Sequence, residues 1–107
     1  MLQCEANYSN AHGSPWVYKY KKIGKLVGMP VPGTMTSVNW ETLIDNSLVF
    51  GIPVIGYQKA DGGYLENDQL EPDIKVANSP ETVVKGEDTQ LKVAVEELLK
   101  EIDAKKK

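Results

Sequence analysis

The sequence predicts an α/β fold, with α+β as the alternative, in which two main helices accompany a mixed β-sheet. Three observations lead to this prediction: apolar residues recur at helical spacing near the C-terminus, a long apolar run in the middle is typical of a strand, and a strand-then-helix pattern opens the chain. With 107 residues, 41% hydrophobic and 25% charged, the chain has the size and composition of one ordinary globular domain.

The first third of the chain predicts a strand, a helix and a second strand. Residues 1–4 are a short apolar-polar run, and residues 10–22 are expected to form a helix whose regular part begins nearer Ser14, because Gly13 and Pro15 interrupt its first turn. Gly24 is a plausible C-cap. The buried face of this helix is expected to carry the residues spaced at i, i+4 and i+7, namely Trp16, Tyr20 and Ile23.

The middle of the chain predicts strands separated by loops and turns. Residues 26–29 are apolar and end at a Pro-Gly-rich loop over 30–34, which cannot continue a ladder of hydrogen bonds. A strand is expected over 36–41, with Val38 and Trp40 on one face. The most apolar run of the chain, 48–57, predicts a long strand that is bent or bulged at its glycine and proline.

The last part of the chain begins with the clearest turn signal. Asp61-Gly62 predicts a hairpin, with residues 64–67 returning alongside the long strand. Residues 74–76 alternate like a short strand, and Asp88 is expected to cap a helix from Thr89 to Ile102. One face of that helix carries the apolar residues Leu91, Val95, Leu98 and Ile102.

Composition excludes several classes of function. The net charge is −3, and the only basic cluster is the C-terminal run 105–107, so no nucleic-acid partner is expected. The single cysteine, Cys4, excludes an internal disulfide and is too few for a cysteine-based metal site. No apolar run is long enough for a membrane span. The pattern is compatible with an exported or a cytoplasmic protein.

A stretch rich in small and polar residues, 7–15, joins the first expected strand to the first expected helix. Ser9 would lie on this turn near the helix N-terminus, where unpaired N–H groups and the helix dipole favour negative charge. Such a position suits a nucleophile whose reaction passes through an oxyanion. On local sequence alone, an ordinary N-cap serine is the more common explanation.

Short motifs along nearly the whole chain give a more specific signal. They occur at 9–12 (SNAH), 23–28 (IGKLVG), 32–34 (PGT), 50–53 (FGIP), 64–67 (YLEN), 71–74 (EPDI) and 86–91 (GEDTQL). Each is weak alone, but together they have the order and spacing of one family. The chain resembles the catalytic region of the tail-specific and tricorn-like serine peptidases, and the tricorn-like branch is the closer match. The implied fold is the C-terminal part of a ClpP/crotonase-like peptidase core.

The resemblance implies roles for three residues. Ser9 matches the nucleophile, and Asn10 stands where the family usually has an aspartate whose backbone N–H helps to form the oxyanion hole. Glu66 matches a catalytic glutamate that, in the tricorn-like branch, supports the general-base histidine through a serine. The other branch uses a Ser/Lys dyad, but this chain has Thr34 in the matching segment, which argues for the Ser/His/Glu version. Without the resemblance, Glu66 would be interpreted as a solvated residue at a strand edge.

The general base is the piece that the sequence lacks. His12, the only histidine, follows Ser9 by three positions and could be its neighbour on one helical turn, although an exposed first-turn histidine is the expected case. In the family the base lies far upstream of the nucleophile. The chain, 1–107, is therefore interpreted as a single domain that forms the C-terminal portion of a larger peptidase domain, inactive in isolation.

The resulting hypothesis is a serine endopeptidase that cleaves a polypeptide substrate through an acyl-enzyme, without a cofactor or a metal. Asp68, Glu71 and Asp73 form an acidic cluster, but their spacing lacks the pattern of an EF-hand. One alternative is a non-catalytic module that binds a peptide or partner on a degenerate peptidase fold. Another is a fragment whose exposed sheet edge drives homo-oligomerisation.

Overall fold

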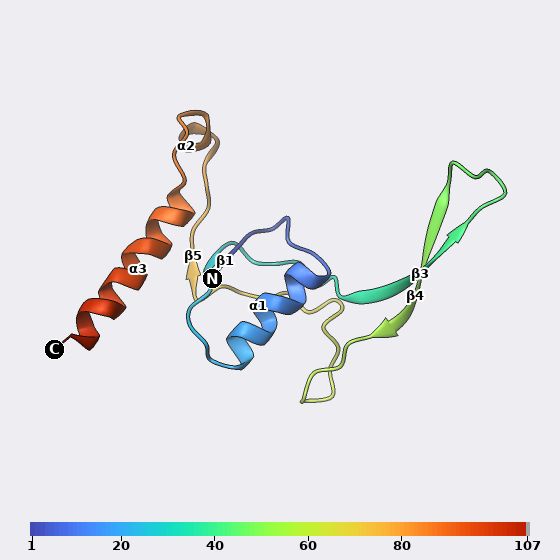
Figure 1. Ribbon diagram of the computed structural model, residues 1–107, viewed down its shortest axis with the longest axis horizontal. Helices are drawn as coiled ribbons and strands as arrows, with labels where there is room; N and C mark the ends of the chain where they lie inside the picture. The colour runs from blue at the N-terminus through green and yellow to red at the C-terminus, as the bar shows by residue number, and fades with distance from the viewer. Residues whose placement is uncertain (107) are drawn as a thin grey trace.

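The computed structural model describes residues 1–106, and Figure 1 shows how its helices and strands are arranged. Short strands and helices alternate in a body from which one long ribbon projects. The elements in chain order are β1 (Leu2–Gln3), α1 (Asn10–Tyr20), β2 (Val27–Gly28), β3 (Thr36–Thr42), β4 (Val49–Gly56), β5 (Ile74–Lys75), α2 (Pro80–Val84) and α3 (Thr89–Lys105). The predicted α/β class is thus confirmed.

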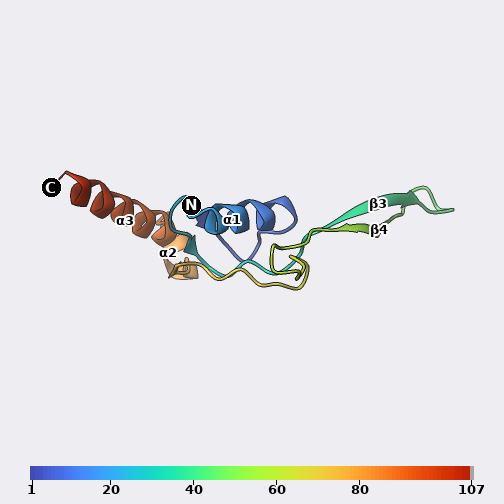
Figure 2. The ribbon, with the colours of Figure 1, turned by 90° about the horizontal axis from the view of Figure 1, so that it is seen from below.

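The body is built on a small parallel sheet in the order β1-β2-β5. Leu2 pairs with Val27, and Val27 pairs with Ile74, so each strand contributes only two residues to the ladder. Helix α1 forms the crossover between β1 and β2, and Figures 1 and 2 both show the sheet lying between α1 and α3. No helix within residues 1–106 combines the length and the apolar character that a membrane crossing needs.

The core of the body is a cluster of aliphatic side chains from β2 and the loops beside it. Leu26, Val31 and Leu70 are buried, and Trp16 and Tyr18 of α1 pack against them. Val31 and Leu70 also form a two-way backbone bridge, with N···O distances of 3.0 Å in both directions. Burial of this cluster attaches α1 to the sheet through the hydrophobic effect.

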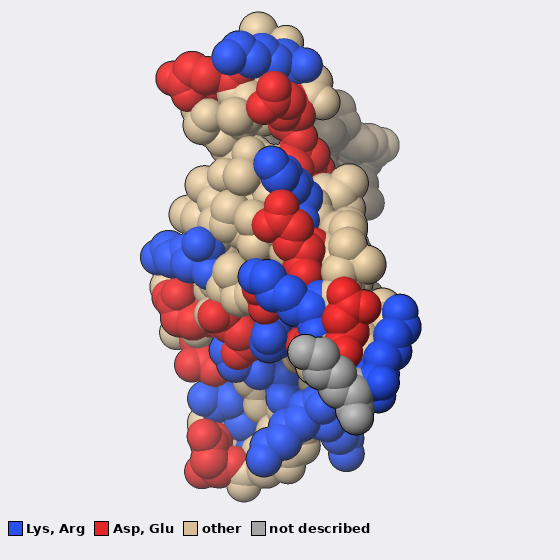
Figure 3. Space-filling model, turned by 90° about the vertical axis from the view of Figure 1, so that its left-hand side faces the viewer, with Lys and Arg blue, Asp and Glu red and all other residues tan. Residues whose placement is uncertain are grey.

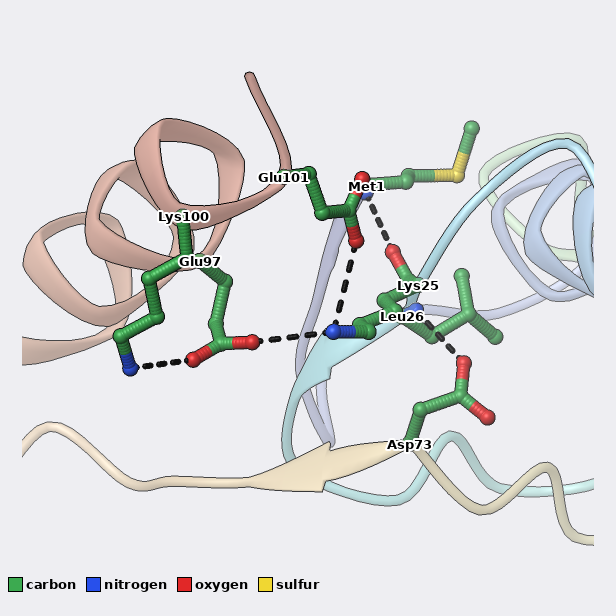
Figure 4. A network of polar contacts seen from close by, with 7 residues as sticks. All are labelled: Met1, Lys25, Leu26, Asp73, Glu97, Lys100 and Glu101. Carbon is green, nitrogen blue, oxygen red and sulfur yellow. Dashed lines mark hydrogen bonds and ion pairs between the residues drawn. The ribbon is translucent and has the colours of Figure 1, made fainter. Parts of the chain in front are cut away.

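Polar contacts attach α3 to the same sheet. Figure 4 shows Lys25, next to β2, reaching Glu97 and Glu101 of α3, with Nζ···O distances of 3.0 and 3.4 Å. Beside it, the N-terminal ammonium of Met1 donates to the Lys25 carbonyl at 2.7 Å. Acidic and basic side chains alternate over the end of the molecule formed by α3, as Figure 3 shows. Because these ion pairs are partly exposed to solvent, each is expected to contribute little to stability.

The projecting ribbon consists of β3 and β4, which we call the arm (residues 36–56). Its strands are antiparallel and paired from Thr36 with Gly56 to Thr42 with Val49. The register shifts by one residue after Ser37, so β4 carries a bulge near its proline, as predicted. The arm extends away from the body in both ribbon views and gives the molecule extents of 63 × 40 × 18 Å.

The predicted helix near residue 10 differs from the observed one in its boundaries and its buried face. Helix α1 begins at Asn10 rather than near Ser14, because the Ser9 carbonyl already closes the first turn. Of the three predicted residues, Trp16 packs against the core, but Tyr20 and Ile23 are exposed. The fully buried residues of the helix are His12, Gly13 and Pro15. The chain leaves the helix at Lys21, before Gly24, so the predicted glycine cap was wrong.

One further prediction needs correction, one element was not predicted, and one prediction was accurate. After the predicted turn, Leu65 N–H donates to the Tyr57 carbonyl at 2.9 Å, but residues 64–67 form no strand: a single bridge joins Tyr64 to Gln58, and Asn67 then adopts a left-handed conformation. The short helix α2, capped by Ser79, was not predicted. Asp88 caps α3 as predicted, because its side chain accepts the Leu91 N–H at 2.9 Å.

Candidate functional site

Ser9 lies at the corner between β1 and α1, where the sequence places it. Its backbone has φ 53° and ψ −123°, a conformation that is rare for a residue with a side chain. Two contacts hold the corner: the Ser9 N–H donates to the Thr34 carbonyl at 2.8 Å, and the Ser9 carbonyl accepts from His12 N–H at 2.8 Å. Within residues 1–106 the hydroxyl makes no capping hydrogen bond, so Ser9 is not an ordinary N-cap.

The segment 33–35 connects this corner to the predicted catalytic glutamate. On one side Thr34 accepts the Ser9 N–H. On the other side the Glu66 carboxylate accepts the Met35 N–H at 2.6 Å, and Asn67 N–H donates to the Gly33 carbonyl at 2.7 Å. Ser9 and Glu66 are therefore anchored to consecutive residues of one segment, although 57 positions separate them in the sequence.

Glycines allow α1, residues 33–35 and residues 66–68 to lie close together. A Cβ atom added to Gly33 would stand 2.2 Å from the Asp68 backbone nitrogen, and one added to Gly13 would stand 2.8 Å from Met35 Cε. The first contact involves backbone, which cannot move aside easily. The close packing of α1, residues 33–35 and residues 66–68 therefore depends on residues without side chains.

Asn10 is the first residue of α1 and is exposed. Its backbone N–H makes no hydrogen bond to any of residues 1–106. A free N–H beside Ser9, at the positive end of a helix, is the kind of donor that can stabilise an oxyanion. Because the donor is a backbone group, the asparagine side chain is not required for it.

His12 is completely buried beneath the Ser9 corner, so the expectation of an exposed first-turn histidine was wrong. The ring lies beside the Asp68 backbone, but neither of its nitrogens has a hydrogen-bond partner of acceptable geometry within residues 1–106. Burial lowers the pKa of His12 below 6.5, and the opposing charges of Asp68 and Glu66 do not fully offset it. The ring makes no hydrogen bond to Ser9 and is not placed as its base.

An apolar groove of about 800 Å³ opens beside the corner. It is lined by residues along α1 and by residues 57–58, which follow β4. The residues that line it nearest the site are Asn10, Gly13, Ser14, Val17, Met35 and Leu65. Two of the lining residues, Met35 and Leu65, directly flank the Thr34 and Glu66 anchors, so the groove and the candidate site share a wall.

The acidic residues after Glu66 are engaged separately rather than gathered into one site. Asp68 pairs with Lys59 at 3.0 Å, and Asp73 accepts the Leu26 N–H at 2.7 Å and pairs with Lys19 at 3.2 Å. Partial burial raises the pKa of Asp73, but the Leu26 N–H and Lys19 together lower it below its ordinary value. Among residues 1–106 no three His, Cys, Asp or Glu side chains are grouped to hold a metal.

Comparison with known proteins gives the family. The sequence profile described as peptidase family S41 matches residues 1–76, which is most of the chain. The chain belongs to peptidase family S41. This S41 chain is also 33% identical over 101 residues to the Tricorn-like protease C-terminal subunit of Sulfurisphaera tokodaii, and 24% identical over 98 residues to the Tricorn protease of Thermoplasma acidophilum.

The tricorn-like character holds for the fold as well as the sequence. The crystal structure of the tricorn protease matches 95% of the S41 chain with a TM-score of 0.82 at 22% identity. The two sequence matches include 92% and 89% of this chain but only 12% and 9% of the lengths of the two relatives. The structural match includes 10% of the solved tricorn chain. The chain thus spans about a tenth of the length of the proteins it matches. The predicted resemblance to tricorn-like peptidases is confirmed by these sequence and structure matches.

The sequence identified Ser9, Asn10 and Glu66 as candidates but not the residues that hold them. The anchoring by Thr34 and Met35 was missed, because it depends on contacts between distant segments. The only available signal was the Pro-Gly-Thr motif at 32–34, which gave the family without giving a role. The burial of His12 had a local signal in Gly13, whose lack of a side chain lets α1 approach Met35.

Proposed function

We propose that this S41 chain carries the nucleophile, Ser9, and the catalytic glutamate, Glu66, of a serine endopeptidase that hydrolyses peptide bonds in a full-length parent. The observation that supports the proposal is the shared anchor: Ser9 N–H and the Glu66 carboxylate bond to the consecutive residues Thr34 and Met35. The strained Ser9 backbone leaves its hydroxyl without a capping role.

In the proposed reaction the Ser9 oxygen attacks the scissile carbonyl carbon while a general base takes its proton. The Asn10 N–H donates to the resulting oxyanion. The base then protonates the leaving amine, and water hydrolyses the acyl-enzyme to regenerate Ser9. No cofactor is needed for these steps, because the nucleophile, the base and the oxyanion donor are all protein groups.

The base is proposed to come from outside these 107 residues, supported by Glu66 in the manner of the tricorn-like branch. His12, the only histidine, is buried and makes no hydrogen bond to Ser9. The chain is therefore proposed to be the C-terminal portion of a larger peptidase domain and inactive alone. Its short share of the relatives' length supports this proposal.

The substrate is proposed to be a polypeptide that lies in the groove beside Asn10. The groove is apolar and shares Met35 and Leu65 with the walls of the site. A groove of this kind can bind side chains next to the scissile bond by apolar contact, and binding energy spent there positions the carbonyl for attack.

A fluorophosphonate probe tests the proposal on the full-length parent. The folded parent should be labelled at Ser9, and Ser9→Ala should abolish labelling and lower kcat/KM by about 10⁴-fold or more, because no other group can form the acyl-enzyme. Ser47→Ala, in the turn of the arm, is the matched control and should label normally. Failure of the folded wild-type parent to react, or labelling that survives Ser9→Ala, would refute the proposal.

A second candidate function is a non-catalytic module that binds a peptide or partner. The exposed apolar residues of the arm, such as Trp40 and Phe50, favour it. This candidate predicts that the parent binds a peptide equally well with and without Ser9→Ala and hydrolyses nothing. A loss of binding on shortening the arm, without a change in labelling, would assign the binding to this region.

A further inference from the structure

His12 is the one completely buried ionisable side chain among residues 1–106, and the proposed reaction does not use it. It lies in the first turn of α1 and is packed against the layer formed by residues 33–35 and 66–68. Both ring nitrogens are buried, and within residues 1–106 neither makes a hydrogen bond of good geometry, although the Asp68 backbone lies near the ring. Buried polar atoms are nearly always paired, so an imidazole with two unpaired nitrogens requires an explanation.

The charges that face the ring are both acidic. Asp68 acts on His12 most strongly and Glu66 next, and both lie on the segment packed against α1. Lys59 pairs with Asp68 at 3.0 Å and brings one positive charge to this group. The neutral ring bonds neither carboxylate, whereas an imidazolium with two N–H donors could bond one.

We propose that His12 is a pH-responsive positioning residue that, on taking up a proton, draws the Glu66 carboxylate away from the Met35 N–H. The two states differ in one exchange of hydrogen bonds. With neutral His12, Glu66 accepts from Met35 at 2.6 Å, as observed. With protonated His12, Glu66 accepts from the ring, and the Met35 N–H loses its carboxylate partner.

Glu66 is the carboxylate that moves because no cation among the described residues 1–106 pairs with it. Asp68 is already paired with Lys59 at 3.0 Å, whereas the observed partner of Glu66 is an uncharged amide. A new positive charge in this buried layer gains more from a carboxylate without a counter-ion than from one that has one. The field of Asp68 still helps the ring to take up its proton.

The consequence for activity rests on the proposed function. Glu66 is the group proposed to support the general base, so a protonated His12 would neutralise the charge on which that base depends. Met35 directly follows Thr34, whose carbonyl accepts the Ser9 N–H, so release of Met35 would loosen the segment that holds the nucleophile. The site would be switched off as the pH falls, through a residue that does not contact the substrate.

Nuclear magnetic resonance on the 107-residue chain tests the coupling without requiring hydrolysis. His12 gives the only histidine ring signal, so its titration can be followed without ambiguity. We expect its midpoint below 6.5, and we expect the Met35 amide signal to move with the same midpoint. A His12 midpoint at or above 6.5, or a Met35 signal that does not follow it, would overturn the proposal.

Variants separate the coupling from simple structural support. In His12→Gln, which keeps a polar side chain but does not titrate, the acid step of the Met35 amide should vanish, and its persistence would contradict the proposal. If that variant does not fold, Glu66→Gln serves instead: His12 should still titrate while the Met35 step is lost. Asp68→Asn should lower the His12 midpoint, and Glu41→Gln in the arm should leave it unchanged.

These outcomes are independent of the peptidase proposal. Coupling of His12 to Met35 with no probe reaction at Ser9 would remove the proposed function and keep the switch. Labelling of Ser9 without coupling of His12 to Met35 would remove the switch and keep the proposed function. If both hold, the acid limb of the parent's kcat/KM profile should move in His12→Gln.

Discussion

The body and the arm contain the same kinds of apolar residues, but the body buries them and the arm leaves them exposed. Leu26, beside β2, is completely buried, whereas Leu48, before β4, exposes 52% of its surface. Val31 of the body is also completely buried, and Val54 of the arm is 59% exposed. An apolar run therefore specifies a strand, but it does not specify that the strand will be covered.

The difference follows from what each region packs against. The short strands of the body are covered by α1 and α3 and by the loops that join them. The long strands of the arm pair mainly with each other, and a two-stranded ribbon leaves both of its faces open. We expect the body to determine the stability of the chain and the arm to be available for contacts with other parts of a larger protein. The following predictions compare the two regions.

The largest effect should come from truncating a leucine in the body. Leu26→Ala should lower the free energy of unfolding by about 2–5 kcal/mol, because it leaves a cavity in the core cluster. The same truncation in the arm, Leu48→Ala, should cost less than about 1 kcal/mol, because the side chain is already half exposed. Urea denaturation of both variants measures the contrast. Equal losses would show that the arm is packed in solution.

A smaller effect should come from filling the close approach at the site. Gly33→Ala should cost about 1–3 kcal/mol, because the new Cβ would meet the Asp68 backbone nitrogen at 2.2 Å. In the arm, Gly51→Ala would meet the Trp40 ring at 3.0 Å, and an exposed side chain can turn aside, so we expect less than about 1 kcal/mol. Thermal unfolding compares them. A tolerated Gly33→Ala would show that residues 33–35 and 66–68 are not in close contact.

The smallest effect should be the change in the free energy of unfolding with pH that two aspartates with lowered pKa contribute. Asp73 in the body has a folded-state pKa below 3.8, so the unfolded state binds more protons at low pH. The stability that ionised Asp73 contributes is present above pH 3.8 and is lost as the pH falls through its folded-state pKa. Because the side chain is about one third exposed, we expect this to be about 1 kcal/mol or less.

Asp45, in the turn of the arm, is the matched control for that measurement. The Ser47 hydroxyl and N–H lower its pKa in the same direction, but the group is fully exposed. Unfolding should be followed from pH 6 to pH 2.5 in the wild type, Asp73→Asn and Asp45→Asn. Asp73→Asn should flatten the acid slope, and Asp45→Asn should change it less. The opposite ranking would mean that the arm contributes more to acid stability than the body does.

Prediction from the sequence succeeded where the signal is local. Asp88 caps α3 through its own side chain, and the proline of β4 marks the bulge, because both effects act within a few residues. It failed where burial is decided by distant segments. Tyr20 and Ile23 have the spacing of a buried helix face and are exposed, because α1 contacts the 33–35 segment through its small residues instead.

By itself, the sequence determined the α/β class, the Asp88 cap of α3, the bulge in β4 and membership of peptidase family S41, together with the corner at which Ser9 lies. Only the tertiary structure decided that Glu66 bonds to Met35, 31 residues away, that His12 is completely buried, and that the arm is left uncovered. The physical reason is range. Caps and turns depend on neighbours along the chain, whereas burial and long-range hydrogen bonds depend on which distant segments pack together.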